Sequence, residues 1–204
     1  MAEPKHLVKY GVSNFEYGIL GTNDLVATTK KVPGLSEVKL DIKTDKKNIK
    51  ADNESYVDLY AGIQEATEQI SIYDINPEMG TDFFGIEKIK GVQLYDQDIR
   101  PNEVATLFRT ELSDGSHMWV GMLKGTFVLP SNTYKTVENT PDADPESSEG
   151  SFLPRSVGDD KKRVLLVARD SDPDFDFDTF HKWVFPKTVD EARIKTSPQN
   201  EQNS

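Results

Sequence analysis

The sequence predicts an all-β fold: an antiparallel β-sandwich or barrel with one or two short flanking α-helices, α+β by a strict count. Strand-like alternation runs through the first two-thirds of the 204 residues and is clearest in LSEVKLDIKT, residues 35–44. There Val38, Leu40 and Ile42 point to one side and the intervening charged residues to the other, which is the period of a half-buried strand. Helix signals are few and do not alternate with strands, so a parallel βαβ architecture is not expected.

Turn-forming residues separate the other strands. The predicted strand segments are residues 14–20, 35–44, 48–53, 63–75, 90–96, 103–112, 117–130 and 163–170. We interpret the apolar run RVLLVARD, residues 163–170, as a central strand. Ser113–Ser116 predicts a tight hairpin, because Asp-Gly supplies the positive φ that such turns require. The stretch 136–152, rich in Pro, Asp, Glu and Ser, has too few apolar residues to pack and is predicted to be a mobile loop.

Two expectations concern the segment between residues 44 and 75. Thr44–Lys47 is expected to turn the chain, and residues 54–62 form an ambiguous connector with two tyrosines. Farther on, four alternate residues share one face: Ala66, Glu68, Ile70 and Ile72. Because the glutamate interrupts this apolar row, the N-terminal half of the strand is expected to project beyond the core.

A short helix is predicted after residue 76. Asn76 is a good N-cap, Pro77 suits the first helical position, and Glu78 favours the positive end of the helix dipole. Gly85 is a natural stop, so the helix has two to three turns.

Five aspartates near the C-terminus alternate as in a calcium-binding loop: Asp170, Asp172, Asp174, Asp176 and Asp178. An EF-hand loop requires glycine at its sixth position and glutamate at its twelfth, whereas Phe175 and His181 stand there. The residues that follow instead form an apolar stripe at helical spacing, namely Phe177, Phe180 and Val184 with Trp183 on its flank. We therefore expect Asp174 or Asp176 to cap a second helix, and no metal site.

The sequence gives no support for a catalytic or cofactor site. His6, His117 and His181 lie in three different predicted elements, and no nucleophile, phosphate-binding or zinc motif is present. Gly121 and Gly125 lie inside a predicted strand, where close packing or a bulge is more typical than a phosphate loop.

Composition narrows the classes of partner. The chain has no cysteine, so disulfides and thiolate metal sites are excluded, and its net charge of −11 argues against wrapping nucleic acid. An acidic surface fits DNA that passes without sticking, and equally fits simple solubility. Neither a signal peptide nor a membrane-spanning apolar run is visible, so we expect a soluble protein made in a cytoplasm, without a membrane anchor.

One basic cluster stands out in this acidic chain. It comprises Lys39, Lys43, Lys46, Lys47 and Lys50. It is either a solvated strand face or, if copies of the chain associate, a partner for acidic stretches such as Asp142–Glu149.

The order of these elements resembles the major tail proteins, or tail tube proteins, of long-tailed bacteriophages that infect Gram-positive bacteria. The resemblance covers about residues 7–186. It rests on KYGVSNFEYGIL, on KKVPGLSEVKLDIKTDKKNIKADN and on YAGIQEATEQISIYDINPEMGTDFFG, followed by RPNEVATLFRTELSDGSHMWVGMLKGTFVLP and the closing FHKWVF. It does not extend to the acidic loop 139–151 or to the tail after Pro186.

The resemblance implies a subunit that closes into hexameric rings, which stack into a hollow tube in the virion tail after assembly in the host cytoplasm. It also implies relatedness to the tube proteins of contractile secretion systems. The implied partners are other copies of the chain, a tape-measure protein, tail initiator and terminator proteins, and DNA in transit without specific binding. Its domain organisation would be an N-terminal arm (1–9), a single β-sandwich domain (10–186) and a flexible C-terminal tail (187–204).

Within that domain, residues 44–62 are expected to form a projecting hairpin that makes the ring-to-ring contact. The candidate contact residues are Lys46, Lys47, Lys50, Asn53, Tyr56 and Tyr60. The alternative is a virion-associated β-sandwich module that binds a carbohydrate or a receptor, with an exposed aromatic residue such as Trp119 as its platform. The strand parity around Trp119 does not decide which way it faces.

Overall fold

Ten β-strands and three α-helices form the part of the chain that the computed structural model describes, residues 7–51, 54–132, 144–157 and 161–194. The strands are β1 (Lys9–Leu20), β2 (Val26–Lys31), β3 (Leu35–Ala51), β4 (Glu54–Ile72), β5 (Glu87–Ile89), β6 (Val92–Leu94), β7 (Val104–Leu112), β8 (His117–Phe127), β9 (Glu146–Phe152) and β10 (Leu165–Arg169). The helices are α1 (Pro77–Phe84), α2 (Phe177–Val184) and α3 (Val189–Ala192), and a 3-10 turn, η1, spans Thr22–Asp24. The predicted all-β class, with short flanking helices, is confirmed.

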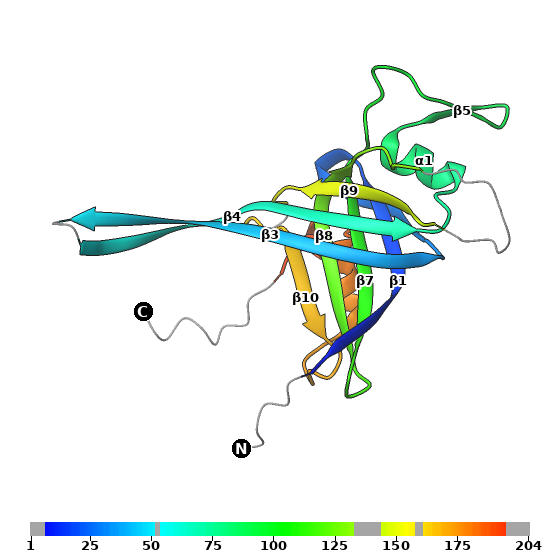
Figure 1. Cartoon of the computed structure of the whole chain (residues 1–204). Helices are drawn as coiled ribbons and strands as arrows, with labels where there is room; N and C mark the ends of the chain where they lie inside the picture. The colour runs from blue at the N-terminus through cyan, green and yellow to red at the C-terminus, as the bar shows by residue number, and fades with distance from the viewer. Residues whose placement is uncertain (1–6, 52–53, 133–143, 158–160, 195–204) are drawn as a thin grey trace, which may run out of the picture.

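Eight of these strands form one antiparallel sheet, seven of them in the order β2-β1-β7-β8-β9-β4-β3 and the eighth, β10, beside β8 (Figure 1). Strand β8 pairs with β7 along one edge. Its other edge is shared, because Met118–Met122 pairs with β10 and Gly125–Phe127 pairs with β9. The sheet curls until β3 approaches β1, which makes a sandwich of two layers. Strands β5 and β6 form a separate small hairpin.

The two layers differ in how they are covered. The layer β2-β1-β7-β8, here called the helix-covered layer, packs one face on the main core and the other against α2. The layer β9-β4-β3, here called the open layer, packs only one face on the main core. None of the helices in the described residues lies over its other face, which is turned toward the viewer in Figure 1.

Helix α1 closes one end of the sandwich. As predicted, Asn76 caps it, with its Oδ1 accepting a hydrogen bond from the Met79 amide at 2.9 Å. Gly85 ends it in the left-handed region at φ 69°, where a Cβ would stand 2.2 Å from the Arg100 carbonyl oxygen. Phe83 and Phe84 are fully buried in the main core.

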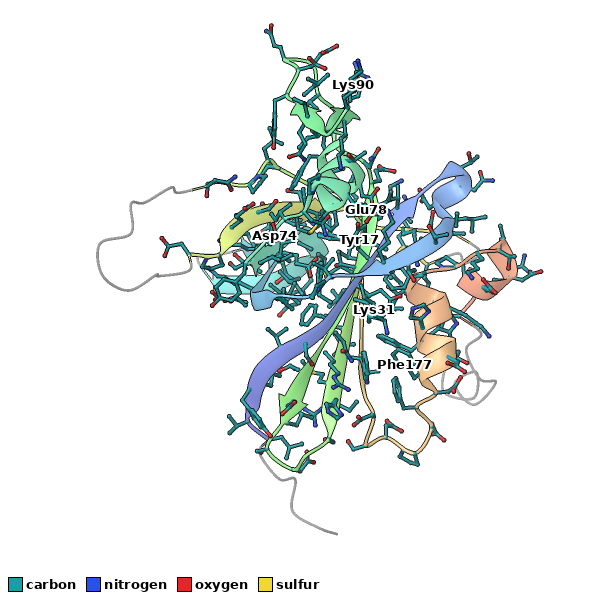
Figure 2. The ribbon with its side chains drawn as sticks, turned by 90° about the vertical axis from the view of Figure 1, so that its right-hand side faces the viewer. Tyr17, Lys31, Asp74, Glu78, Lys90 and Phe177 are labelled. Atoms are coloured by element: carbon teal, nitrogen blue, oxygen red, sulfur yellow. The ribbon has the colours of Figure 1, made fainter. Side chains whose placement is uncertain are left out.

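A partly buried polar network ties α1 to the sheet. The Tyr17 hydroxyl donates to Asp82 Oδ2 at 2.7 Å, and Lys30 Nζ lies 2.6 Å from the same oxygen and 2.8 Å from Glu78 Oε1. Figure 2 shows Tyr17 and Glu78 close together where the sheet meets the helix. Burial, together with the negative charge of Asp82, raises the pKa of Tyr17, so its hydroxyl remains a donor.

The predicted turn at Thr44–Lys47 is wrong, because β3 runs without interruption to Ala51. That segment contains no glycine or asparagine, so it lacks the residues that adopt positive φ easily in a tight turn. Register shifts between Lys43 and Lys46 absorb the irregularity as bulges, and the connector 54–62 belongs to β4.

The prediction that Glu68 interrupts the apolar row, and that the strand therefore leaves the core, is also wrong in its reason. Glu68 is fully buried and shares the inner face of β4 with Ala66, Ile70 and Ile72. The first half of β4 does leave the sandwich, but the reason is that β9 pairs with β4 only from Ala66 onward.

Three further expectations need correction, two of them in the C-terminal third. Residues 146–152, predicted as part of a loop, form β9, because Gly150 and Phe152 alternate inward and the Phe127 ring packs closely over Gly150. Residues 136–143 of that predicted loop lie outside the described residues. The predicted central strand is β10, but it is not central: among the described strands it pairs with β8 alone, and Val167 is exposed. Of the strand predicted at 90–96, only Val92–Leu94 forms, as one side of the β5–β6 hairpin.

Candidate assembly surfaces

A long two-stranded arm projects from the open layer (Figure 1). It consists of the distal part of β3, Lys43–Ala51, paired with Glu54–Glu65 of β4. Nine residues of β3 at about 3.3 Å each make an arm roughly 30 Å long. Register shifts and the positive φ of Gly62 (72°) interrupt its ladder, which twists the arm and makes its edges poor templates for unspecific strand pairing.

Within the described residues, no further strand extends the sheet along this arm. Strand β9 stops opposite Ala66, so beyond that point the two arm strands pair with each other and with no other described strand. An isolated two-stranded hairpin is only marginally stable in water.

The predicted contact residues fall on this arm. Lys46, Lys47 and Lys50 lie on β3, Tyr56 and Tyr60 on β4, and the backbone register places Lys46 opposite Tyr60. Tyr60 is 73 % exposed, as an aromatic contact residue must be before assembly. Asn53 lies outside the described residues.

Sequence reasoning missed a second surface, an apolar groove below the open layer. It has a volume of about 410 Å³ between the starts of β1, β3 and β8 and the end of β7. Its apolar lining comprises Val12, Val38, Leu40, Phe108, Met118 and Val120. The groove exists because β1, β7 and β8 extend past the edge of the open layer, a property of the sheet's curl that the strand patterns do not reveal.

A third surface, the tip of the β5–β6 hairpin, is also apolar. Ile89 and Val92 pair across the hairpin and are both exposed, and Tyr95 beside them is exposed as well. In Figure 2, Lys90 marks this tip at the end of the molecule opposite the start of β1.

Two of the three histidines, which were considered as catalytic candidates, instead pair with carboxylates inside the fold. His117 Nδ1 lies 2.7 Å from Asp170 Oδ2, and His181 Nε2 lies 3.1 Å from Glu16 Oε1. His6 lies outside the described residues. Burial opposes ionisation of Asp170, but hydrogen bonds from the His117 amide and ring outweigh it and lower the pKa of that carboxyl. Across the described ranges, no three His, Cys, Asp or Glu side chains gather as a metal site would require.

These geometries describe a β-sandwich with a projecting arm, an apolar groove and an apolar hairpin tip. The family model described as "Phage tail tube protein" matches residues 16–192. The chain belongs to the phage tail tube protein family.

Solved structures similar to this tail tube family member come from the anti-feeding prophage. One is a chain in the structure of its tube-terminating cap, with 12 % identity and a TM-score of 0.44. The alignment covers 82 % of the present chain and 99 % of the chain in the cap structure. Another is a chain in the structure of its baseplate, with 7 % identity and a TM-score of 0.41. The alignment covers 82 % of the present chain and 97 % of the chain in the baseplate structure. Among proteins with curated descriptions, none matches.

Family membership makes this chain a structural component of a phage tail. The described helices include none with the length and apolar character to cross a membrane. Trp119, the aromatic residue suggested for sugar binding, packs against Phe177 of α2 with 4.5 Å between the centroids of the tilted rings, and the Arg109 guanidinium lies 5.7 Å from the centroid of its ring. Its ring is therefore used within the fold, and no observation favours the binding module.

The aspartates that resemble a calcium loop shape the start of α2. Asp176 is the N-cap, with Oδ2 accepting a hydrogen bond from the Thr179 amide at 2.9 Å, and Asp178 lies in the first turn. Asp172 accepts a hydrogen bond from the Asp174 amide. Gly121 and Gly125 are close-packing positions, as expected, since a Cβ at Gly121 would stand 2.4 Å from Val184.

The cap gives the first testable prediction. Replacing Asp176 with alanine removes the acceptor of the Thr179 amide and should lower the free energy of unfolding by about 0.5–2 kcal/mol. Urea denaturation measures this change. Asp174→Ala, two residues earlier and outside the cap, is the matched control. Equal losses in both variants would contradict the role of Asp176.

Proposed function

We propose that this chain is the repeating subunit of the tail tube of a long-tailed phage that infects Gram-positive bacteria. Six copies close into a ring, and rings stack around a channel through which DNA leaves the virion. The subunit is made in the host cytoplasm and ends in the virion tail. The observation that carries this proposal is the projecting arm, in a member of the tail tube family.

The arm supports ring stacking for a geometric reason. A contact between two different surfaces of the same chain closes into a ring or continues as a filament. A tube needs both, so each subunit needs lateral contacts and an axial contact. The arm extends roughly 30 Å from the sandwich, enough to reach a subunit in the next ring. Lys46, Lys47, Lys50, Asn53, Tyr56 and Tyr60 are the proposed ring-to-ring contact.

Other partners follow from the same proposal. A tube of fixed length requires a protein that nucleates the first ring, one that stops growth and one that sets the length, and these are the initiator, terminator and tape-measure proteins. DNA passes through the channel and is not bound by it.

Negative-stain electron microscopy of the purified protein at high concentration tests the proposal. We expect rings or tubes with a central hole. If the protein stays monomeric both alone and with a tail initiator complex, the proposal is wrong.

The contact assignment has its own prediction. Replacing Tyr56 and Tyr60 together with serine should leave a folded monomer, since Tyr60 contributes exposed area and not core packing, yet abolish tube formation. Sedimentation velocity and electron microscopy measure assembly, and circular dichroism measures folding. Tyr73→Ser is the control, because Tyr73 is exposed (53 %) but lies on the sandwich beyond the end of β4. Normal tubes from the double variant would refute the assignment.

A further inference from the structure

The apolar groove is a gap in the covering of the main core. Three of its apolar lining residues are buried, namely Phe108, Met118 and Val120. The other three pack against the core but are only half-buried, namely Val12, Val38 and Leu40. Covering such surface is favourable by about 25 cal/mol for each Å² of apolar area removed from water. The groove therefore favours an apolar occupant of matching size.

The tip of the β5–β6 hairpin supplies an apolar projection. Lys90 and Gly91 both have positive φ, 51° and 85°, as in the two-residue type I′ turn that joins hairpin strands tightly. This turn brings Ile89 and Val92 together as a cross-strand pair at the end of the hairpin, with exposed fractions of 47 % and 59 %. Tyr95 adds a third exposed apolar side chain. Clustered apolar exposure of this kind is typical of a surface that contacts another protein.

The tip and the groove lie toward opposite ends of the molecule. The hairpin projects beyond α1 in Figure 1, and Lys90 marks its tip at the top of Figure 2. The groove lies between the starts of β1, β3 and β8 and the end of β7, and the start of β1 is at the bottom of both views. A tip therefore cannot enter the groove of its own chain. Two different surfaces of one chain that fit each other make a head-to-tail contact between copies, which closes into rings or continues as a filament.

The charged residues around the two surfaces are compatible with such a contact. Lys9 and Glu37 line the groove and are exposed, and Glu87 and Lys88 are exposed on the hairpin beside the tip. Both surfaces thus carry both signs of charge, so Lys88 can pair with Glu37 and Glu87 with Lys9. Charges at the rim of an interface fix its register, while its centre is apolar.

We propose that the β5–β6 tip of one copy docks in the apolar groove of the next copy, with Ile89 and Val92 against the half-buried part of the lining. The proposal rests on the proposed function, which requires contacts between copies besides that of the arm. Specific interfaces bury roughly 800 Å² on each partner, so the contact of one hairpin tip acts together with other contacts, such as that of the arm.

Cysteine cross-linking tests the contact, because the chain has no cysteine of its own. Ser36→Cys places a thiol at an exposed position of the groove lining. Lys88→Cys places one beside the tip and leaves Ile89 and Val92 in place. The two variants are mixed, concentrated until they assemble, and treated with a short bifunctional maleimide. Denaturing gel electrophoresis reports covalent dimers.

We expect a covalent dimer from the mixture and none from either variant alone, since a head-to-tail contact brings the groove of one copy to the tip of another. In a control mixture, Lys182→Cys on the exposed side of α2 replaces Lys88→Cys and should give no dimer. Dimers from Lys88→Cys alone would show that tips meet tips. An equal yield from the control mixture would show unspecific collision. Either result overturns the proposal.

A charge at the tip should break the contact. In the Lys88→Cys background, Val92→Asp would place a carboxylate in an apolar groove and should lower the yield of cross-linked dimer at least about tenfold. Val92 is exposed in the free chain, so the fold should survive, which circular dichroism checks. Val167→Asp, the same substitution at an exposed valine of β10 (53 %), is the matched control. A loss no greater than that of Val167→Asp would contradict the proposal.

Failure of the proposed function looks different. If tubes form and the mixture gives no dimer, the docking proposal fails and the proposed function stands. If the mixture cross-links but the unsubstituted chain forms no tubes, alone or with a tail initiator complex, the contact stands and the proposed function fails. If neither tubes nor cross-links form, both fail.

Discussion

Replacing Arg155 with methionine is expected to lower the free energy of unfolding by about 3–5 kcal/mol. Arg155 is 5 % exposed, and its guanidinium donates to three carbonyl oxygens. Nη1 lies 3.0 Å from Leu123 O on β8 and 2.9 Å from Val184 O at the end of α2, and Nη2 donates to Trp183 O. One cation thus joins the last turn of α2 to the helix-covered layer.

The expected loss is large because methionine fills the space but donates no hydrogen bond. Each buried carbonyl left without a partner costs about 1–3 kcal/mol, and the helix loses a positive charge near its negative end. Burial lowers the pKa of Arg155 to about 10, which still leaves the guanidinium charged at neutral pH. Arg155→Lys should recover only part of the stability, since one ammonium cannot reproduce the planar fork.

Urea denaturation of the two variants and the parent measures these differences. Arg193→Met is the control, because Arg193 forms an exposed ion pair with Asp190 and should change stability by less than about 1 kcal/mol. An Arg155→Met variant no less stable than Arg193→Met would show that the three carbonyls find other donors.

The second large effect concerns pH and the buried carboxyl of Glu68. The Thr106 hydroxyl donates to Glu68 Oε2 at 2.6 Å, but Oε1 is buried without a partner among the described residues. Burial raises the pKa of Glu68 from its ordinary value of 4.5 to about 8, and the Thr106 hydrogen bond only partly opposes this. Folding therefore favours the protonated carboxyl.

The sign of the pH dependence follows from this difference. Below pH 4.5 the group is protonated in both states and has no effect, and between pH 4.5 and about 8 stability falls as the unfolded state alone releases its proton. At 1.36 kcal/mol per pH unit, the total loss above pH 8 is on the order of 5 kcal/mol. Glu68→Gln, which cannot ionise, should remove this loss and be clearly more stable than the parent at pH 9.

Urea denaturation at several pH values between 4 and 9 tests this expectation. Glu65→Gln, on the exposed face of the same strand, should leave the shape of the pH profile unchanged. Similar profiles for the parent and Glu68→Gln would mean that Glu68 ionises inside the fold with little penalty.

Local patterns in the sequence predicted the local structure well. Asn76, Pro77 and Gly85 bound α1, Asp176 caps α2, and Asp-Gly forms the β7–β8 turn. Each of these depends on a few adjacent residues whose preferences act over one turn. The expectation that Gly121 lies at a close contact was correct for the same reason.

Apart from the turn predicted at Thr44–Lys47, a local pattern that continues as β3, the clearest failures depended on contacts distant in sequence. Residues 146–152 look too polar for a strand, yet Phe127 and Gly125 on β8 receive the small and aromatic inner residues of β9. Glu68 looks like a break in an apolar row, yet its partner is Thr106, 38 residues away. Nothing near Arg155 in the sequence predicts that it anchors a helix starting at Phe177.

Strand β8 is hydrogen-bonded along both of its edges, whereas the arm is a two-stranded hairpin. We therefore expect the sandwich and the arm to differ in stability. Because β8 is paired on both edges, we expect its amides to exchange with solvent only when the whole sandwich unfolds. The arm pairs with no other described strand beyond Ala66, so we expect it to open and close on its own at a small cost in free energy. A free subunit would thus combine a stable sandwich with a weakly stabilised arm. If the arm contacts a neighbouring subunit, incorporation into a tube would strongly protect the arm amides from hydrogen exchange.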